Sequence, residues 1–394
     1  MATSTTPSIY GLLCFARGGT TPPTSATAQT GAAAPTLPEL HLNIWEQNPG
    51  KGSKNPDSFL DIGLMLDIRD HTASIELVFP RKMPVASVVD LSTVVTQAQA
   101  IPAIFNESWA VVHMGSNGAD SVVYDPTSTN KSFAVVSING AITETQHGGT
   151  DALSISVSNL IDRANAVARS TQRTVERVYV RFRLLEFKRE YYSVGAGERT
   201  SSWWQPSWQK TEDIDFRVNV RRGAPPGLET QVGRFLEFSK IHLFLMRSRD
   251  KDIVFQDKLF KASRSLEDED FWAQYSIAGT QLSPKASHKR VQNSLGYHWK
   301  AAAGSDPVKE FGTLARFKVV EFGVGKFVAV ALIVGAMGNM LWDGVKVVYN
   351  QLVSHGDQPV AAASSVEVPA AARAADQQPA AMKAKRLAEE KEGG

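Results

Sequence analysis

Between residues 39 and 260, large apolar side chains repeatedly occupy every second position of short runs. Leu60, Ile62, Leu64, Leu66 and Ile68 form the clearest run, with small or polar residues between them. Alternation of this kind is typical of a strand, because successive side chains point to opposite faces of a sheet. Similar runs predict strands at 73–79, 109–114, 122–124, 133–138, 177–187, 214–221 and 240–247.

One segment of this region has a helical period instead. Leu153, Val157, Leu160, Ile161 and Ala164 recur every three or four residues, which places them on one face of a helix. The overall prediction for residues 39–260 is a mainly β domain, an antiparallel sandwich or open barrel with one internal helix. The segment 261–304 is interpreted as a linker or lid that contains one short helix.

The two ends of the chain differ from this central region in composition. Residues 1–38 are rich in Thr, Ala, Gly and Pro, and residues 356–394 are rich in Ala, Pro and Gln. Such segments bury too little apolar surface to offset the entropy lost on ordering. They are predicted to be a flexible N-terminal arm and a disordered C-terminal tail. Within the arm, the short apolar run 9–15 is interpreted as a strand or a docking arm rather than a signal peptide.

The most apolar segment of the chain runs from residue 327 to residue 342. Asp306 and Pro307 suit a helix start, so residues 305–355 are predicted to form one long helix with a transmembrane segment at about 324–348. The sixteen apolar residues cover about 24 Å of a hydrocarbon core of about 30 Å, and extension of the helix closes the gap. The alternative is a helix buried in a soluble oligomer.

Flanking charges predict how this segment is oriented. The twenty residues before the apolar run 327–342 contain four basic residues, which are Lys309, Arg316, Lys318 and Lys326. The twenty residues after the run contain only one lysine or arginine, Lys346. Basic flanks stay in the cytoplasm. The prediction is therefore a single-pass membrane protein whose N-terminal domain is cytoplasmic and whose partner is the lipid bilayer.

One face of the predicted membrane helix carries polar or small residues. Gly335, Asn339, Asp343 and Lys346 share this face at about 100° per residue. Polar groups inside a bilayer face neighbouring helices or water, so these residues are predicted to line an oligomer interface or a pore in a homo-oligomer. The alternative is that the helix has left the bilayer by Asp343 and its end is solvated.

Two predicted strands carry arginines on alternate positions, and a Trp-rich segment connects them. If the strands pair, their guanidinium groups form a basic patch suited to phosphate, and the aromatic rings can stack on bases. The patch predicts binding of a nucleotide or short oligonucleotide, while the alternative is a solvated charged face. The candidate ligand-binding residues are Arg177, Arg181, Arg183, Arg217, Arg221, Trp203 and Trp204.

Composition and motifs limit the chemistry. With 42 basic and 40 acidic residues, the chain does not have the charge of a general nucleic-acid coat protein. The single cysteine, Cys14, rules out internal disulfides and cysteine-based zinc sites. No phosphate-binding loop, nucleophile elbow or His-Glu-x-x-His motif is present. No catalytic residue, metal or cofactor is therefore predicted, and the histidines His113 and His242 are interpreted as packed or hydrogen-bonded side chains rather than ligands.

The layout of a cytoplasmic β-rich module on a C-terminal membrane helix resembles that of membrane-acting effectors of bacterial immune systems, whose sensor domains read nucleotide signals. The resemblance implies an oligomeric, channel-forming effector in antiviral defence, gated by an anionic ligand. Two other hypotheses remain open. One is a structural or scaffold protein, of a virion or a membrane, without ligand gating. The other is a membrane-bound enzyme whose site has no recognisable motif.

Overall fold

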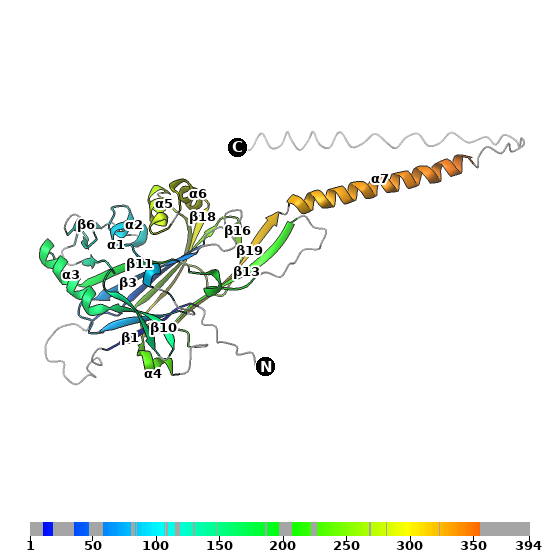
Figure 1. Ribbon diagram of the computed structural model, residues 1–394. Helices are drawn as coiled ribbons and strands as arrows, with labels where there is room; N and C mark the ends of the chain where they lie inside the picture. The colour runs from blue at the N-terminus through cyan, green and yellow to red at the C-terminus, as the bar shows by residue number, and fades with distance from the viewer. Residues whose placement is uncertain are drawn as a thin grey trace, which may run out of the picture. The chain divides into compact units, whose positions relative to one another are not determined.

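The protein is described by a computed structural model that covers two compact units, Met1–Phe327 and Val328–Gly394, each considered by itself. Figure 1 shows the elements of both units. The structure describes residues 11–18, 35–46, 58–79, 83, 85–105, 107, 109–114, 119–128, 131–147, 149–185, 187–196, 207–221, 227–267, 269–280, 282–322 and 324–354.

The first unit is mainly β, as predicted, and contains three open sheets. The largest has ten strands, with β5 (Val88–Asp90) paired to β11 beside the main path. The main path follows the order β17 (Ala262–Ser265), β18 (Ser294–Ala302), β15 (Lys240–Ser248), β2 (Glu39–Trp45), β3 (Phe59–Asp67), β11 (Arg177–Leu184), β8 (Ser132–Val135), β7 (Ser121–Tyr124) and β6 (Ala110–His113). The β15–β2 and β11–β8 pairs are parallel, so this sheet is mixed rather than purely antiparallel as expected.

Two smaller sheets accompany the large one. The five-stranded sheet follows the order β14 (Arg234–Phe235), β1 (Leu13–Arg17), β4 (Ser74–Val78), β10 (Thr150–Ser156) and β9 (Ile142–His147). The four-stranded sheet follows the order β12 (Ser193–Ala196), β13 (Ser207–Val218), β19 (Phe311–Phe322) and β16 (Lys251–Gln256). A parallel bridge between Leu12 and Val218 links the two.

The main core lies between the large sheet and the two smaller ones. The even-numbered residues of β2 and β3, such as Leu42 and Leu64, pack there with Leu77 of β4 and Phe216 of β13. Helix α3 (Val157–Thr171) adds Leu160 and others, and Ser156 caps its first turn by accepting from the Asn159 backbone N–H at 3.3 Å. The predicted internal helix is confirmed from Val157 onward, whereas Leu153, which was expected on the same helical face, lies in strand β10. The apolar faces of the alternating strands are the faces buried in this core.

The opposite face of the large sheet is partly covered by helices, which Figure 1 shows above β3 and β11. Trp45, Phe59 and Tyr179 on the sheet pack against Trp272 and Tyr275 of α5 in a second core. The small helix α4 packs outside the five-stranded sheet. The shorter helical elements are η1 (Val85–Ser87), α1 (Ser92–Val95), α2 (Ala100–Phe105), η2 (Arg189–Tyr191), α4 (Leu228–Val232), α5 (Glu269–Ile277) and α6 (Pro284–Gln292).

The interpretation of residues 261–304 as a linker or lid is wrong. This segment supplies β17, α5, α6 and β18, and β18 pairs with β15 along its whole length. The predicted short helix corresponds to α5, whose Phe271, Trp272 and Tyr275 are buried. The segment is part of the β-rich unit because these aromatic rings pack against the large sheet. Its sequence has no regular spacing of apolar residues that would have predicted this packing.

The prediction of one continuous helix over residues 305–355 is also wrong. Residues Phe311–Phe322 form β19, which pairs with β13 over twelve residues, from Val218↔Phe311 to Ser207↔Phe322. Phe311, Thr313, Ala315 and Phe317 alternate into the core. That alternation is a strand period, and it outweighs the helix-start signal at Asp306 and Pro307.

The predicted flexible arm 1–38 contains a strand, which agrees with the strand alternative for the run 9–15 and corrects the description of the whole arm as flexible. Residues Leu13–Arg17 form β1, which lies between β4 and β14. The sequence Leu-Cys-Phe-Ala is buried on both faces, since Cys14 faces the main core and Phe15 packs with α4. Residues 1–10 and 19–34 of the predicted arm lie outside the described residues. The predicted tail 356–394 does so as well.

The described part of the second unit belongs to one helix, α7 (Val324–Ser354). Its side chains from residue 331 to 353 are exposed, including Leu332, Met340 and Leu341. The segment Ala331–Val353 is 23 residues long and is apolar enough to cross a membrane by length and composition. At the α-helical rise it measures about 34 Å, against a hydrocarbon core of about 30 Å.

Candidate functional site

The large sheet carries an open cleft on the part of its helix-side face that the helices leave uncovered. The cleft has a volume of about 750 Å³. Its floor comes from three neighbouring strands, because residues that pair directly across strands share a face. His242 of β15 lies opposite His41 of β2 and Lys300 of β18, and Phe244 lies opposite His298. We call this feature the basic cleft.

The charges around the basic cleft are predominantly positive. Three carboxylates line it, those of Glu39, Glu107 and Glu176. Against these stand six cationic side chains: Lys131, Arg177, Lys240, Lys261, Arg264 and Lys300. Among the residues that the structure describes, Lys261 and Lys300 have no ion-pair partner. The cleft therefore has an excess of positive charge that is not neutralised internally.

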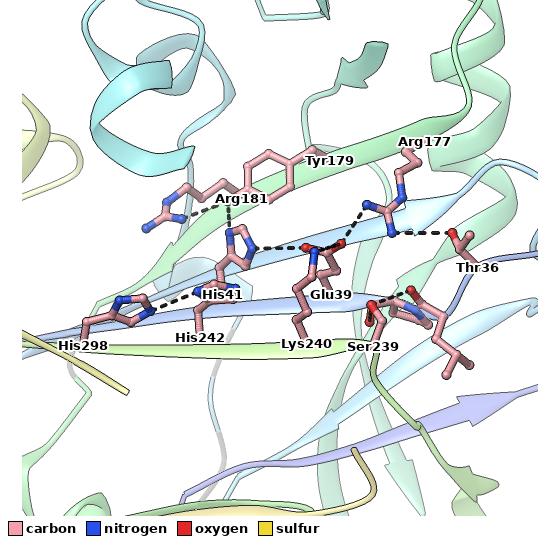
Figure 2. A network of polar contacts seen from close by, with 12 residues as sticks. Thr36, Glu39, His41, Arg177, Tyr179, Arg181, Ser239, Lys240, His242 and His298 are labelled. Atoms are coloured by element: carbon pink, nitrogen blue, oxygen red, sulfur yellow. Dashed lines mark hydrogen bonds and ion pairs between the residues drawn. The ribbon is translucent and has the colours of Figure 1, made fainter. Parts of the chain in front are cut away.

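Three histidines form a row across the floor (Figure 2). The ring centroids of His41 and His242 lie 5.0 Å apart, and those of His242 and His298 lie 5.2 Å apart with the two rings nearly coplanar, at an interplanar angle of 15°. His242 Nδ1 and His298 Nε2 are 3.0 Å apart and share a hydrogen bond. Since only one of these nitrogens can donate, the pair fixes complementary tautomers on the two rings.

The surroundings keep all three histidines neutral. Burial and the nearby Lys300 lower the pKa of His242 to about 4, although Glu39 opposes them. Burial, His242 and Lys261 lower the pKa of His298 to about 3. The pKa of His41 is also well below its ordinary value, because the ring is buried and lies beside His242. Desolvation and like charge disfavour imidazolium at all three positions.

Glu39 is the acidic centre of the cleft floor, as Figure 2 shows. It accepts hydrogen bonds from Arg177 Nη1 at 2.8 Å and from Lys240 Nζ at 3.2 Å. Burial by itself raises the pKa of this carboxyl, but Arg177 and Lys240 lower it below its ordinary value. Glu39 is therefore ionised and holds two of the cations in place along the cleft.

Arg181 lies on the same face of the sheet as His41, beside the cleft floor, and is 1% exposed. Its Nε donates to Tyr275 OH at 2.7 Å and its Nη1 to Tyr179 OH at 2.9 Å. In the orientation that satisfies both groups, the Asn43 amide oxygen accepts from Nη2 at 2.8 Å. No carboxylate of the described residues lies within 4 Å of this guanidinium. A buried cation solvated only by neutral groups adds to the positive potential beside the cleft.

A small cavity of about 10 Å³ lies against Arg181 and shares several lining residues with the basic cleft, among them His41, Phe244 and Arg264. Its volume is at the lower limit for one water molecule. The buried guanidinium is thus separated from the cleft by little more than one layer of side chains. Its charge acts on the cleft through a poorly hydrated interior, where the electrostatic effect of a charge is larger than in water.

The end of the cleft near β8 is aromatic. The Phe105 ring lies 5.2 Å from Phe133 and 5.0 Å from Tyr179, and the Trp109 ring lies 5.3 Å from Phe133. Trp109 and Phe105 are only partly buried and line the cleft. The cleft therefore offers an aromatic wall at one end and lysines at the other.

The predicted arginine patch does not form. The two arginine-bearing strands do not pair, because β11 lies in the large sheet and β13 in the four-stranded sheet. Arg177 alone reaches the cleft. Arg183 is fully buried and paired with Asp61 at 2.7 Å. The polar face of β11 is not solvated as expected, because α5 and α6 cover it.

The other predicted ligand-binding residues lie elsewhere. Arg217 pairs with Asp215 on its own strand at 2.5 Å, and Arg221 lies 3.7 Å from Glu229 at an exposed position. Trp203 and Trp204 fall outside the described residues. The basic cleft therefore differs from the predicted patch: Arg177 belongs to both, and Arg181 is buried beside the cleft.

The predicted pore or oligomer face lies on α7. Gly335, Asn339, Asp343 and Lys346 are all exposed on this helix, and Asp343 and Lys346 approach to 3.9 Å. The ion pair is local to one helical turn. The four residues therefore form one polar face on the described helix, as expected, and their role in assembly remains a prediction.

Sequence reasoning missed the histidine row, because His41, His242 and His298 come from three separate strands. A usable signal was present in β15, where Lys240, His242 and Phe244 share one face, and in β18, where His298 and Lys300 do. A histidine and a lysine on the same face of each of two strands indicate that this face of the sheet is a polar surface and not part of the apolar core. His242 was correctly interpreted as hydrogen-bonded, but its partner is another histidine.

The residues do not point to a metal. Within the described part of the chain, no group of three or more His, Cys, Asp or Glu side chains is arranged to hold a metal ion. The cations Lys240, Lys261 and Lys300 around the histidine pair also oppose a divalent cation. The arrangement is suited to an anion instead.

Comparison with known proteins does not identify a family. No protein-family profile matches the chain, and no curated protein matches it in sequence. Among solved structures, the chain is similar to the Fcho1 mu homology domain of Danio rerio with bound Eps15 peptide, at 9% identity and a TM-score of 0.16. The similarity covers 73% of this chain and 81% of that one. A TM-score this low defines no common fold, so the basic cleft is interpreted from its own residues.

Proposed function

We propose that this protein is a membrane-anchored receptor for a small anionic molecule, which binds in the basic cleft. The observation that carries the proposal is the excess of cationic side chains around a cleft of about 750 Å³, with the buried charge of Arg181 beside its floor. Small-molecule sites commonly measure about 300–1,000 Å³. An anion with two or more negative charges would replace the missing counter-charge of Lys261 and Lys300.

The two ends of the cleft favour a phosphorylated molecule that contains a planar ring. Lysines act as point charges for phosphate, and an aromatic wall of Phe105, Phe133 and Trp109 suits a ring that stacks. A mononucleotide or cyclic nucleotide has both parts. This supports the nucleotide class expected from the sequence, at a different place on the molecule.

Membrane attachment through α7 is the second part of the proposal. The exposed apolar length of Ala331–Val353 supports a single span, and the basic residues before it support a cytoplasmic location of the β-rich unit. Assembly into a homo-oligomer through the face that contains Gly335 and Asn339 would give the helices polar partners. Ligand-gated channel opening and a role in antiviral defence remain hypotheses, as does the scaffold alternative. A liposome leakage assay separates the channel from the scaffold, because only a channel releases ions when ligand is added.

Charge reversal at the lysine end is expected to abolish ligand binding. The Lys261→Glu and Lys300→Glu double variant places two negative charges where the phosphate would bind, and we expect each change to weaken binding by about tenfold or more. The measurement uses full-length protein in detergent micelles and a panel of nucleoside monophosphates, cyclic nucleotides and pyrophosphate. Binding is detected by calorimetry or by thermal stabilisation.

A matched control is available on α6. The Lys285→Glu and Lys289→Glu double variant changes the same total charge at two exposed positions outside the cleft, so it should bind as the wild type does. The proposal would be contradicted if none of the anions bound to the wild type, or if the two double variants lost binding equally. Tighter binding of adenosine than of adenosine monophosphate would contradict the assignment of the lysine end to phosphate.

A further inference from the structure

The hydrogen-bonded histidine pair at the lysine end has two outer nitrogens, His242 Nε2 and His298 Nδ1. The inner nitrogens, His242 Nδ1 and His298 Nε2, are 3.0 Å apart. Among the described residues, neither outer nitrogen has a hydrogen-bond partner. Both residues line the basic cleft. The outer nitrogens are therefore available to a bound molecule.

The protonation state of the pair decides what these outer nitrogens offer. In a neutral pair the inner bond uses one N–H, so one outer nitrogen is a donor and the other is a lone-pair acceptor. An anion oxygen next to that lone pair is repelled. One added proton converts the acceptor into a second donor, so whichever outer nitrogen faces the anion donates an N–H and the pair as a whole carries a positive charge.

We propose that anion binding in the basic cleft is coupled to the uptake of one proton by the His242–His298 pair. This inference rests on the proposed function and concerns the anionic group of its ligand, such as a terminal phosphate or a sulfate. The proton comes from solvent and remains on the pair while the anion is bound. On release of the anion, the pair returns to its neutral form.

The charged groups that face the pair from each strand explain why the free cleft holds it neutral. Lys300 and Lys240 lie on β18 and β15, Lys261 and Arg264 on the segment of β17, and His41 and Glu39 on β2. Arg181 of β11 lies beside His41 on the same face of the sheet, across β3. The cations outnumber the single carboxylate of Glu39, so imidazolium is disfavoured until a further negative charge arrives.

A bound anion is sufficient to reverse this balance. One negative charge at about 4 Å favours the protonated form by a factor of about a thousand, at the effective dielectric constant of a partly buried site. The pKa of His242 is about 4 in the free cleft. A factor of a thousand therefore makes the bound pair about half protonated near neutral pH.

Linkage then requires the affinity for the anion to rise as the pH falls. For a group whose pKa rises from about 4 in the free cleft to about 7 in the complex, the affinity should increase about 20-fold between pH 7.5 and pH 5.5. Inorganic sulfate is the probe, because its own charge stays constant over this range. Full-length protein in detergent is titrated by calorimetry in two buffers of different ionisation enthalpy, which counts the protons taken up.

The expected result is uptake of close to one proton per sulfate at pH 5.5–6.5. His242→Gln and His298→Gln are each expected to bind sulfate with little pH dependence, whereas His71→Gln, outside the cleft, should behave as the wild type. Sulfate binding without proton uptake in the wild type would overturn the inference and leave the proposed function standing. Absence of sulfate binding at every pH would overturn both. If the glutamine variants do not fold, the proton count in the wild type still decides.

Discussion

A chain that ends at residue 323 is expected to be folded and soluble without detergent, whereas a chain that ends at residue 304 is expected not to fold. The two differ by β19, which pairs with β13 along twelve residues and with β16 on its other side. Losing the buried Phe311 and Phe317 alone would cost about 3–5 kcal/mol each. That loss is comparable to the total stability of a typical domain, about 5–15 kcal/mol.

Three chains are compared after expression: full length, residues 1–323 and residues 1–304. We expect the full-length chain in the membrane fraction, the 1–323 chain as a soluble monodisperse protein, and the 1–304 chain in aggregates or degraded. A full-length chain that stays monodisperse in plain buffer would contradict the membrane role of α7. A soluble and folded 1–304 chain would contradict the placement of β19 in the body.

The Asp61→Ala variant is expected to lower stability by about 3–5 kcal/mol. Asp61 and Arg183 are both 0% exposed and form an ion pair at 2.7 Å. Asp61 also accepts from Tyr275 OH at 2.8 Å and from Trp45 Nε1 at 3.1 Å. Its removal leaves a buried guanidinium without its counter-charge, next to the buried Arg181. The expected fall in Tm is about 10 °C, since about 1 kcal/mol shifts Tm by a few degrees in a domain of this size.

Asp213→Ala provides the matched control. Asp213 pairs with Arg316 at 2.6 Å, but the side chains are 27% and 50% exposed. Exposed ion pairs contribute about 0–1 kcal/mol, so this variant should have a Tm within a few degrees of the wild type. The unfolding of both variants is followed by tryptophan fluorescence, because Trp45 and Trp272 are buried near Asp61. An equal fall in Tm in the two variants would contradict the prediction that the buried ion pair contributes more to stability than the exposed one.

Much of the β-rich unit follows from local pattern. The run from Leu60 to Ile68 became β3, and the alternation in Arg177–Leu184 became β11, because one side of each strand is consistently apolar. The helix α3 was also predicted, since its apolar residues recur at helical spacing. The apolar C-terminal segment was recognised by composition alone, and it forms the exposed helix α7.

The candidate site did not follow from local pattern. His41, His242 and His298 come from parts of the chain separated by up to 257 positions, and only the strand order β18–β15–β2 places them side by side. Arg177, Arg181 and Arg183 look equivalent in the sequence. Their environments differ because α5 and α6 cover one end of β11 and leave the other open.

The sequence by itself determined which residues alternate, which recur at helical spacing and which segment is long and apolar, because these properties depend on neighbours a few positions away. The tertiary structure decided which polar faces meet water. Strand pairing joins distant segments, and a covering helix changes an arginine from a solvated surface group to a buried partner of Asp61. The histidine pair and the cleft depend on these long-range contacts, so they became visible only in the folded chain.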